Sequence, residues 1–308
     1  MDFQQEKIKT KQKSVSLRYS TMAMKKLAPL FFSFLLMSLN SNGQSCAELE
    51  QRLLPLYTSL VQGNEANALE QSENILHELE SASDLPDLFS YPFEATHIFK
   101  PVSSDGSLRV FTWNYPKEDG TQLYFGCLFQ KIGKKDSPTF IKFNFKPTNL
   151  PKWETKVYPE EKWTGALYYA IAPMKKGRKD PEAYALLGFN SKDNLSNYKL
   201  LDILTISGGG CKFGGNYFEV KDKNPKRVVF EYGDQVTCSL KYYEKEQTII
   251  VDHLAPRESI YEGFYPEYGP DGSYDGFKFE EGKWKYYPII DIAPFVNGQA
   301  VPFNNPRP

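Results

Sequence analysis

The sequence predicts a mainly β protein, an antiparallel meander that forms a barrel, a sandwich or a propeller-like sheet, preceded by a short pair of helices. Its 308 residues include 22 Phe and 20 Tyr, which favour strands, and 21 Gly and 21 Pro, which favour turns. About ten strand-like runs follow one another, most of them separated by hairpin-sized turns. The clearest run alternates apolar and polar residues from 236 to 243, the period of a strand with one buried face.

The charge balance excludes some partners. Lys and Arg number 37 and Asp and Glu number 38, which leaves a net charge of -1. Such a chain has no global field that would attract nucleic acid, an anionic membrane or an acidic substrate. We therefore expect no nucleic-acid partner.

Residues 1–43 are predicted to be a signal peptide with an upstream extension. Basic residues at 25–26 precede the apolar run LAPLFFSFLLMSL at 27–39, and small residues follow it before Gln44. The run is shorter than the roughly 20 residues that span a bilayer. We expect cleavage near Gly43, export to the periplasm, the cell surface or the medium, and no membrane span in the mature chain.

A lipid anchor at Cys46 is the alternative to simple cleavage. Gly43, Gln44 and Ser45 precede this cysteine, whereas a lipoprotein signal has an aliphatic residue among these positions. The sequence therefore favours cleavage without lipidation.

Residues 44–100 are predicted to form a helical cover and a linker. Leu49, Leu53, Leu56 and Leu60 recur at helical spacing, and a second stripe follows Gly63 with Asn64 as its N-cap. Pro55 is expected to kink or break the first helix, because proline cannot donate the interior hydrogen bond. Two helices are too few for a repeat array, which needs about three repeats. We expect them to cover the sheet.

Residues 101–308 are predicted to be the antiparallel β body, ending in a Pro-rich tail from Pro294. Residues 227–253 are expected to form two hairpins that share the central strand 236–243. The other expected strands are 107–115, 122–130, 139–145, 165–172, 182–189, 198–206, 216–220, 268–279 and 283–287.

Local motifs for chemistry are weak. The run SGGGCKFGG at 207–215 matches neither a phosphate-binding loop nor a dinucleotide fingerprint, so we interpret it as a turn or bulge. Ser196 and Lys199 match SxxK by letter alone, without the helix that would set the lysine beside the serine. Asp252 and His253 are neighbours on a strand and point to opposite faces, so we expect a capping or turn role.

The acidic, tyrosine-rich loop at 265–277 is the candidate binding site. Its candidate residues are Glu267, Tyr268, Asp271, Tyr274 and Asp275. Calcium is a possible cofactor, because carboxylates and turning backbone can supply oxygen ligands, but the full calcium-loop spacing is missing. No other metal or cofactor is predicted.

Two further features have structural interpretations. The four tryptophans could stack on sugars if exposed, but a sheet protein of this size needs aromatic core residues; they are Trp113, Trp153, Trp163 and Trp284. The basic loop 175–179 is expected to be a solvated hairpin tip.

The cysteines are Cys46, Cys127, Cys211 and Cys238, and no two of them form a CxxC pair. This spacing argues against zinc and thioredoxin-type redox chemistry. In an exported protein a disulfide can form, and the preferred pair is Cys211 with Cys238.

Several phrases resemble a family of uncharacterised exported proteins of Bacteroidetes-type bacteria. They include WTGALYYAI at 163–171, YALLGFN at 184–190, KLLDILTIS, CKFGGNYF, RVVFEY, IIVDHLAP and GPDGSYDGFKF, and the resemblance spans roughly 90–287. It implies export and a β-rich body with an N-terminal helical portion, and it carries no activity. Cys211 and Cys238 stand where the family usually has apolar residues, which fits either a bridge or two buried thiols.

These observations favour a non-catalytic exported protein that binds a protein partner or a glycan. The alternative is a secreted hydrolase that acts on glycans or peptides through two carboxylates distant in sequence. Two carboxylates facing each other across a cleft, about 5 to 10 Å apart, would indicate the hydrolase.

Overall fold

The computed structural model describes residues 45–131, 137–147, 152–174, 182–221 and 223–296. These residues belong to one compact unit, which spans Gln44–Pro308. The predicted signal segment 1–43, the basic loop 175–179 and the tail after residue 296 lie outside the described residues.

Two helices open the described chain, as the leucine spacing predicted. Helix α1 spans Cys46–Gln62 and α2 spans Glu65–Ser81. Ser45 starts α1 with a capping box, in which its hydroxyl accepts the Glu48 N–H and the Glu48 carboxylate accepts the Ser45 N–H. Asn64 caps α2 by accepting the Asn67 N–H at 3.0 Å. Helix α1 continues through Pro55 instead of ending there.

In the described residues the β body forms three open sheets, so the sequence prediction of a mainly β protein is confirmed, and the arrangement is sandwich-like. The first sheet has the order β1-β2-β3, with bounds Leu108–Pro116, Gln122–Gln130 and Thr139–Phe143. The second has the order β4-β8-β7-β6-β5, and β10 also pairs with β7. The third has the order β11-β12-β13-β14-β9.

The strands of the second sheet are β4 Tyr158–Pro159, β5 Leu167–Met174, β6 Glu182–Ser191, β7 Ser196–Ser207, β8 Gly210–Phe213 and β10 Val228–Gly233. Those of the third sheet are β9 Phe218–Glu219, β11 Leu240–Tyr243, β12 Thr248–Pro256, β13 Tyr268–Glu280 and β14 Lys283–Tyr287. Pairing is antiparallel except between β14 and β9, which are parallel. Short helices complete the elements: α3 Lys152–Thr155, η1 Glu160–Lys162, η2 Ser259–Tyr261, η3 Tyr265–Glu267 and α4 Ala293–Val296.

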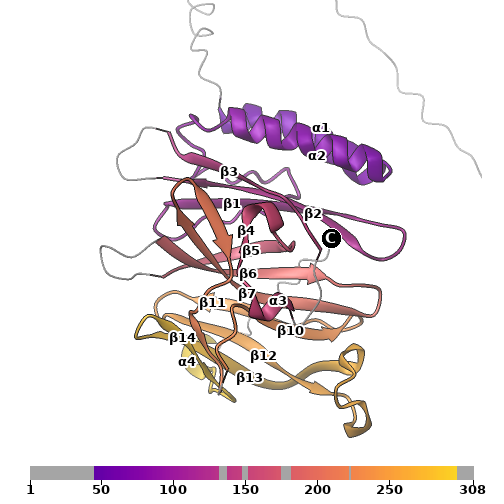
Figure 1. The fold of residues 1–308 in the computed structure, drawn as a ribbon, viewed down its shortest axis with the longest axis vertical. Helices are drawn as coiled ribbons and strands as arrows, with labels where there is room; N and C mark the ends of the chain where they lie inside the picture. The colour runs from indigo at the N-terminus through magenta and orange to yellow at the C-terminus, as the bar shows by residue number, and fades with distance from the viewer. Residues whose placement is uncertain (1–44, 132–136, 148–151, 175–181, 222, 297–308) are drawn as a thin grey trace, which may run out of the picture. The chain divides into compact units, whose positions relative to one another are not determined.

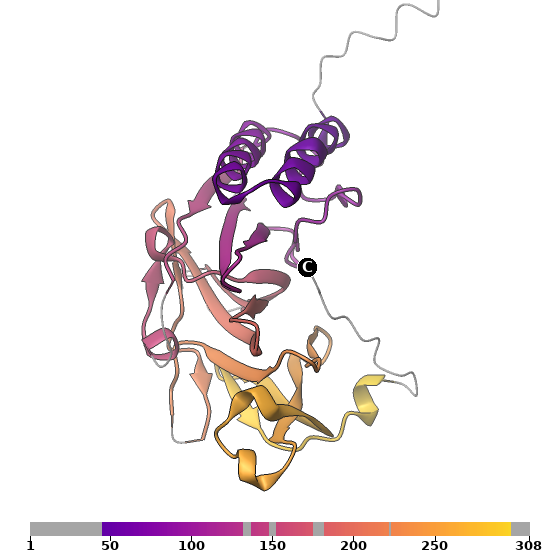
Figure 2. The same cartoon turned by 90° about the vertical axis from the view of Figure 1, so that its right-hand side faces the viewer.

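Three hydrophobic cores lie between four layers. The helices pack on the first sheet through one core, which includes Leu53 of α1 and Phe129 of β2. A second core joins the first and second sheets, and a third joins the second and third sheets. Figures 1 and 2 show the helices beside the first sheet and strands β11–β14 at the opposite end of the unit. The second sheet is therefore buried on both faces.

Burial on both faces explains why β6 and β7 lack a polar face. Along β6, Tyr184 and Leu186 enter the core shared with the first sheet, whereas Ala185 and Leu187 enter the core shared with the third. Strand β7 behaves in the same way, with Leu200 and Leu201 on opposite faces. A central strand covered on both sides is expected to be a nearly continuous apolar run.

The stretch 227–253 forms only one of the two hairpins that its pattern predicted: β11 and β12 pair across the turn 244–247, and the central strand is shorter than predicted, Leu240–Tyr243. Strand β10 pairs with β7 in the second sheet, and β11 pairs with β12 in the third sheet. The chain therefore crosses from one sheet to the next between Gly233 and Leu240. The prediction of the first hairpin was wrong because alternation shows which side chains share a face but does not identify the neighbouring strand.

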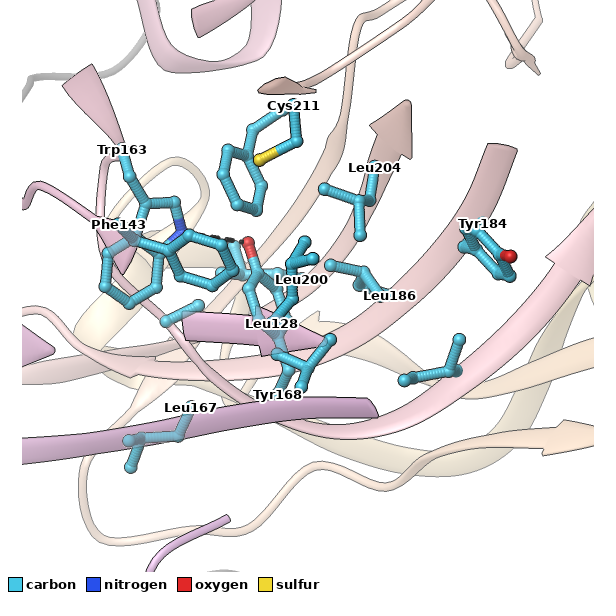
Figure 3. Packing of buried hydrophobic residues seen from close by; sticks show 14 of the residues in the cluster. Leu128, Phe143, Trp163, Leu167, Tyr168, Tyr184, Leu186, Leu200, Leu204 and Cys211 are labelled. Carbon is cyan, nitrogen blue, oxygen red and sulfur yellow. Dashed lines mark hydrogen bonds between the residues drawn. The ribbon is translucent and has the colours of Figure 1, made fainter. Parts of the chain in front are cut away.

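A buried polar network lies in the second sheet and at its boundary with the first. The Trp163 indole N–H donates to the Tyr168 hydroxyl at 3.3 Å (Figure 3). That hydroxyl donates to Asp202 Oδ2 at 3.0 Å. The Arg227 guanidinium, fully buried, donates to Asp202 Oδ1 at 3.2 Å and also to backbone carbonyls. Each buried charge thus has a partner, which offsets its desolvation.

The predicted disulfide between Cys211 and Cys238 is absent. All four cysteines are free and buried. Cys211 belongs to the core between the first and second sheets and Cys238 to the core between the second and third. The tight turn at 208–209, where both glycines have positive φ, returns β8 onto β7 and keeps Cys211 on that strand pair. No helix in the described part of the chain is long and apolar enough to span a membrane.

Candidate functional site

The predicted site residues of the acidic loop are not brought together. Glu267, in η3, pairs with the exposed Arg257 at 3.4 Å, and the Tyr268 hydroxyl accepts the Gly263 N–H at 3.0 Å. Asp271 accepts the Ser273 N–H and hydroxyl in a local turn, which lowers the pKa of its carboxyl.

In the described residues, no group of three or more His, Cys, Asp or Glu has a geometry that could hold a metal ion. Calcium binding by this loop stays a prediction, and a rise in Tm during calcium titration of the purified protein would support it.

Tyr274 and Asp275, the last two predicted site residues, have different surroundings. Tyr274 lines a small cavity with Asp252, and its volume of about 10 Å³ has room for roughly one water. Asp275 is buried, with 5% of its surface exposed, and accepts hydrogen bonds from the Tyr286 hydroxyl and the Ile289 N–H. Within the described residues, the cavity at Tyr274 is too small for a substrate.

His253 is oriented by Asp275 and not by its sequence neighbour. Its Nδ1 lies 2.9 Å from Asp275 Oδ2, whereas Asp252 accepts the Ser239 N–H at 2.7 Å. The two residues lie within β12, at a register shift between Asp252 and Leu254, so the expected turn role is wrong. The strand geometry that separated Asp252 from His253 was predicted correctly.

The tryptophans are core residues, as the composition indicated. Their exposed fractions are 1% for Trp113, 3% for Trp153, and 0% for Trp163 and Trp284. None of them offers an open platform on which a sugar ring could stack. Trp153 nevertheless reaches a cleft with part of its ring.

This cleft is the strongest candidate site in the described part of the chain. It has a volume of about 540 Å³, within the range of roughly 300 to 1,000 Å³ that is typical of small-molecule sites. Side chains from the first and second sheets and from the segments after β3 meet here. The lining residues are Thr121, Gln122, Tyr124, Phe145, Pro147, Trp153, Thr164, Asn190, Ser191, Lys192, Tyr198 and Glu231.

Aromatic side chains form the apolar part of the cleft. Trp153 and Tyr198 meet edge to face with ring centroids 5.5 Å apart, and Tyr124 and Phe145 do the same at 5.5 Å. The Trp153 indole N–H donates to the Thr164 hydroxyl, which fixes the indole plane. These contacts hold the rings in place before any ligand arrives, and a preorganised site spends less entropy on binding.

Charged side chains form one wall. Glu231 Oε1 accepts the Lys192 ammonium at 2.7 Å and the Ser196 hydroxyl at 2.7 Å. The Glu231 side chain is 9% exposed and the Lys192 side chain 37% exposed. Lys192 also lies 3.7 Å from an Asp193 carboxylate oxygen. This wall therefore carries one nearly buried carboxylate, that of Glu231, and one partly exposed ammonium, that of Lys192.

Several polar atoms of the cleft have hydrogen-bonding capacity that no residue of the described chain uses. Asn190 donates through Nδ2 to the Gly165 carbonyl at 2.9 Å, which leaves its Oδ1 as an acceptor. Gln122 accepts through Oε1 from Asn114 at 2.8 Å, which leaves its amide N–H groups as donors. The Tyr198 hydroxyl makes no hydrogen bond to any described residue, and burial raises the pKa of this phenol above its ordinary value.

The sequence did not point to this cleft, because its residues come from five separate segments. A partial signal was present: Asn190 and Glu231 are polar residues within strands that are mostly apolar or aromatic. A polar side chain in a doubly buried strand requires a specific partner or a cavity. That signal does not say which residues from the other sheet would meet it.

A second groove, of about 610 Å³, runs along α1 toward the start of α2. Its lining has no charged and no aromatic side chain, and includes Leu54, Pro55, Gln62 and Asn67. Few groups there can orient a ligand, so the aromatic cleft is the better candidate.

Comparison of the sequence with models of protein families found no match, and comparisons with curated proteins and with solved structures found none either. The function is therefore inferred from the cleft itself.

Proposed function

We propose that this is an exported binding protein whose cleft, lined by Trp153, Tyr198 and Glu231, holds part of a glycan. The observation that carries the proposal is the combination, in one cleft, of rigid aromatic rings with polar atoms that make no hydrogen bond to the described residues. Sugars present apolar C–H faces and many hydroxyl groups, so their recognition requires both features.

The free polar atoms match hydroxyl groups. Asn190 Oδ1 accepts, the Gln122 amide donates, and the Tyr198 hydroxyl can do either. A ligand hydroxyl can also either donate or accept a hydrogen bond, so the hydroxyl groups of a sugar can satisfy all three protein groups. An apolar ligand of the same size would leave these atoms without partners and would lose free energy on binding.

Binding is favoured over hydrolysis by the number of carboxylates. The cleft lining includes one, Glu231, and its Oε1 is already bonded to Lys192 and Ser196. A carboxylate-based glycosidase needs an acid and a second carboxylate about 5 to 10 Å away. Release of product from a bound glycan would support the hydrolase in place of this proposal.

The test is a screen of soluble oligosaccharides with the purified full-length protein, followed by isothermal titration calorimetry on those that bind. Tyr198→Phe removes one hydroxyl and keeps the ring, so we expect about two- to tenfold weaker binding, the effect of one hydrogen bond. Tyr243→Phe, in the third sheet, is the matched control and should bind like the wild type. Binding that is equal in wild type and Tyr198→Phe would contradict the assignment of this cleft.

Export is the second part of the proposal and rests on residues 24–44. We expect the protein purified from the envelope or medium of its own cell to begin at or near Gln44. Mass spectrometry of the N-terminal peptide measures this. A diacylglyceryl group on Cys46 or an uncleaved Met1 would contradict it.

A further inference from the structure

We propose that the cleft selects glycans with a free amino group, and that Glu231 is the residue that binds the ammonium. This inference rests on the proposed glycan function and names the ligand class. Its basis is an ammonium already present at this position, that of Lys192, at 2.7 Å from Glu231 Oε1.

Glu231 is held in place, whereas Lys192 is not. The carboxylate is 9% exposed and accepts the Ser196 hydroxyl at 2.7 Å, a bond within the second sheet. Ser196 itself is fully buried. The lysine is 37% exposed and ends a flexible four-carbon chain. The fixed partner of this ion pair is therefore the carboxylate, and the movable partner is the cation.

The site around Glu231 suits a cation. The Lys192 ammonium lies 5.8 Å from the centroid of the Tyr198 ring, within the distance over which an aromatic face attracts a positive charge. Tyr198 and Glu231 both line the cleft. A ligand ammonium placed there would find the same carboxylate and the same ring.

Lys192 can leave without losing every partner. Its ammonium is also 3.7 Å from Asp193 Oδ2, and Asp193 is fixed by the N–H groups of Leu195 and Ser196 at 2.8 and 2.9 Å. A small rotation would keep the lysine paired with Asp193 while Glu231 accepts the ligand. Lys192 then acts as an internal competitor for the ammonium position.

A neutral sugar cannot replace the lysine as well. Displacing Lys192 with hydroxyl or N-acetyl groups would leave the nearly buried Glu231 carboxylate without a positive partner, and an unpaired buried charge is strongly unfavourable. A protonated amine restores the pair. The difference between the two ligands is the source of the selectivity.

The experiment compares two probes, the β-1,4-linked trisaccharides of glucosamine and of N-acetylglucosamine, by calorimetry at pH 6.5 with the full-length protein. We expect at least tenfold tighter binding of the free-amine trisaccharide. Glu231→Gln should remove this preference. Lys192→Met should tighten binding of the free-amine trisaccharide, because the internal competitor is gone.

Lys142→Met is the matched control, since Lys142 is also 37% exposed and paired with a carboxylate, that of Glu73, away from the cleft. It should bind both probes like the wild type. If Glu231→Gln does not fold, as judged by circular dichroism, the test rests on Lys192→Met, because the Lys192 side chain is partly exposed, at 37%, and its replacement should not prevent folding.

Each outcome separates the two proposals. Weaker binding of the amine by Lys192→Met, or equal binding of both probes by the wild type, overturns the amine selectivity and leaves glycan binding intact. Trilysine, which carries amines but no sugar, is tested as a further probe. If it binds and neither trisaccharide does, the assignment to amino sugars is overturned. No binding of these or any other oligosaccharide overturns the glycan function as well.

Discussion

Lys199 provides a quantitative test of how the second and third sheets pack. Its side chain is 1% exposed, and its ammonium lies 4.8 Å from the Tyr169 ring and 5.4 Å from the Phe189 ring. Burial lowers the pKa of Lys199 from its ordinary 10.5 to about 8, while the nearby Cys238 and Asp252 raise it slightly. Keeping a charged lysine in this buried position therefore lowers the free energy of unfolding.

The cost follows from the difference in pKa. Below pH 8 the lysine is protonated in both the folded and unfolded states, and the folded state carries the full penalty of the buried charge. At about 1.4 kcal/mol for each pKa unit, lowering from 10.5 to about 8 corresponds to about 3 kcal/mol. The two aromatic contacts return about 0.5 to 2 kcal/mol of this.

Lys199→Met is therefore expected to stabilise the protein by about 1 to 3 kcal/mol at pH 7, since Met has similar length and no charge. Between pH 8 and 10.5 the folded wild type loses its proton before the unfolded chain does, so its stability rises relative to the variant. The difference between the two proteins should be largest below pH 8 and should shrink toward pH 10.

Urea unfolding followed by tryptophan fluorescence, at pH 6 to 10, measures this difference. Cysteines and tyrosines whose pKa is raised by burial destabilise both proteins at the alkaline end, and they cancel in the comparison. Lys142→Met should change stability by less than about 0.5 kcal/mol, as surface substitutions do. A wild type more stable than Lys199→Met at pH 7, or a difference that does not vary with pH, would refute the reasoning.

Three further predictions concern stability, each measured by urea unfolding. Asp202→Ala should lose about 3 to 5 kcal/mol because Arg227 would stay buried without its carboxylate, and a loss below 1 kcal/mol would contradict this. Glu50→Ala should lose about 1.5 to 3 kcal/mol, since its carboxylate accepts three hydrogen bonds from the segment after α2; an unchanged midpoint would count against it. Gly126→Ala should lose about 1 to 3 kcal/mol because a Cβ would lie 2.8 Å from the Phe143 ring, unless β2 shifts without penalty.

The sequence predicted the elements better than their neighbours. The hairpins of β1 with β2, β5 with β6 and β11 with β12 were expected, because each pair is joined by a short connection. The pairing of β10 with β7 was not expected, since residues 208–227 separate these strands along the chain. Local patterns do not report contacts between distant segments.

The sequence predicted less of the candidate site than of the fold. It drew attention to Asp275, His253 and the glycine run, and each of these has a packing or hydrogen-bonding role. Glu231 and Asn190 belong to a candidate site only because Gln122 and Tyr124 of the first sheet line the same cleft. A cleft built from two sheets exists in no single segment, so no motif could describe it.

The sequence alone determined the mainly β composition, the helical pair with its caps and the core role of the tryptophans, because propensity, periodicity and capping act over a few residues. Only the tertiary structure decided that three sheets stack, that Cys211 and Cys238 lie in different cores, and that Glu231 meets an aromatic wall. These depend on which apolar face packs against which, and several packings can satisfy the same pattern of residues.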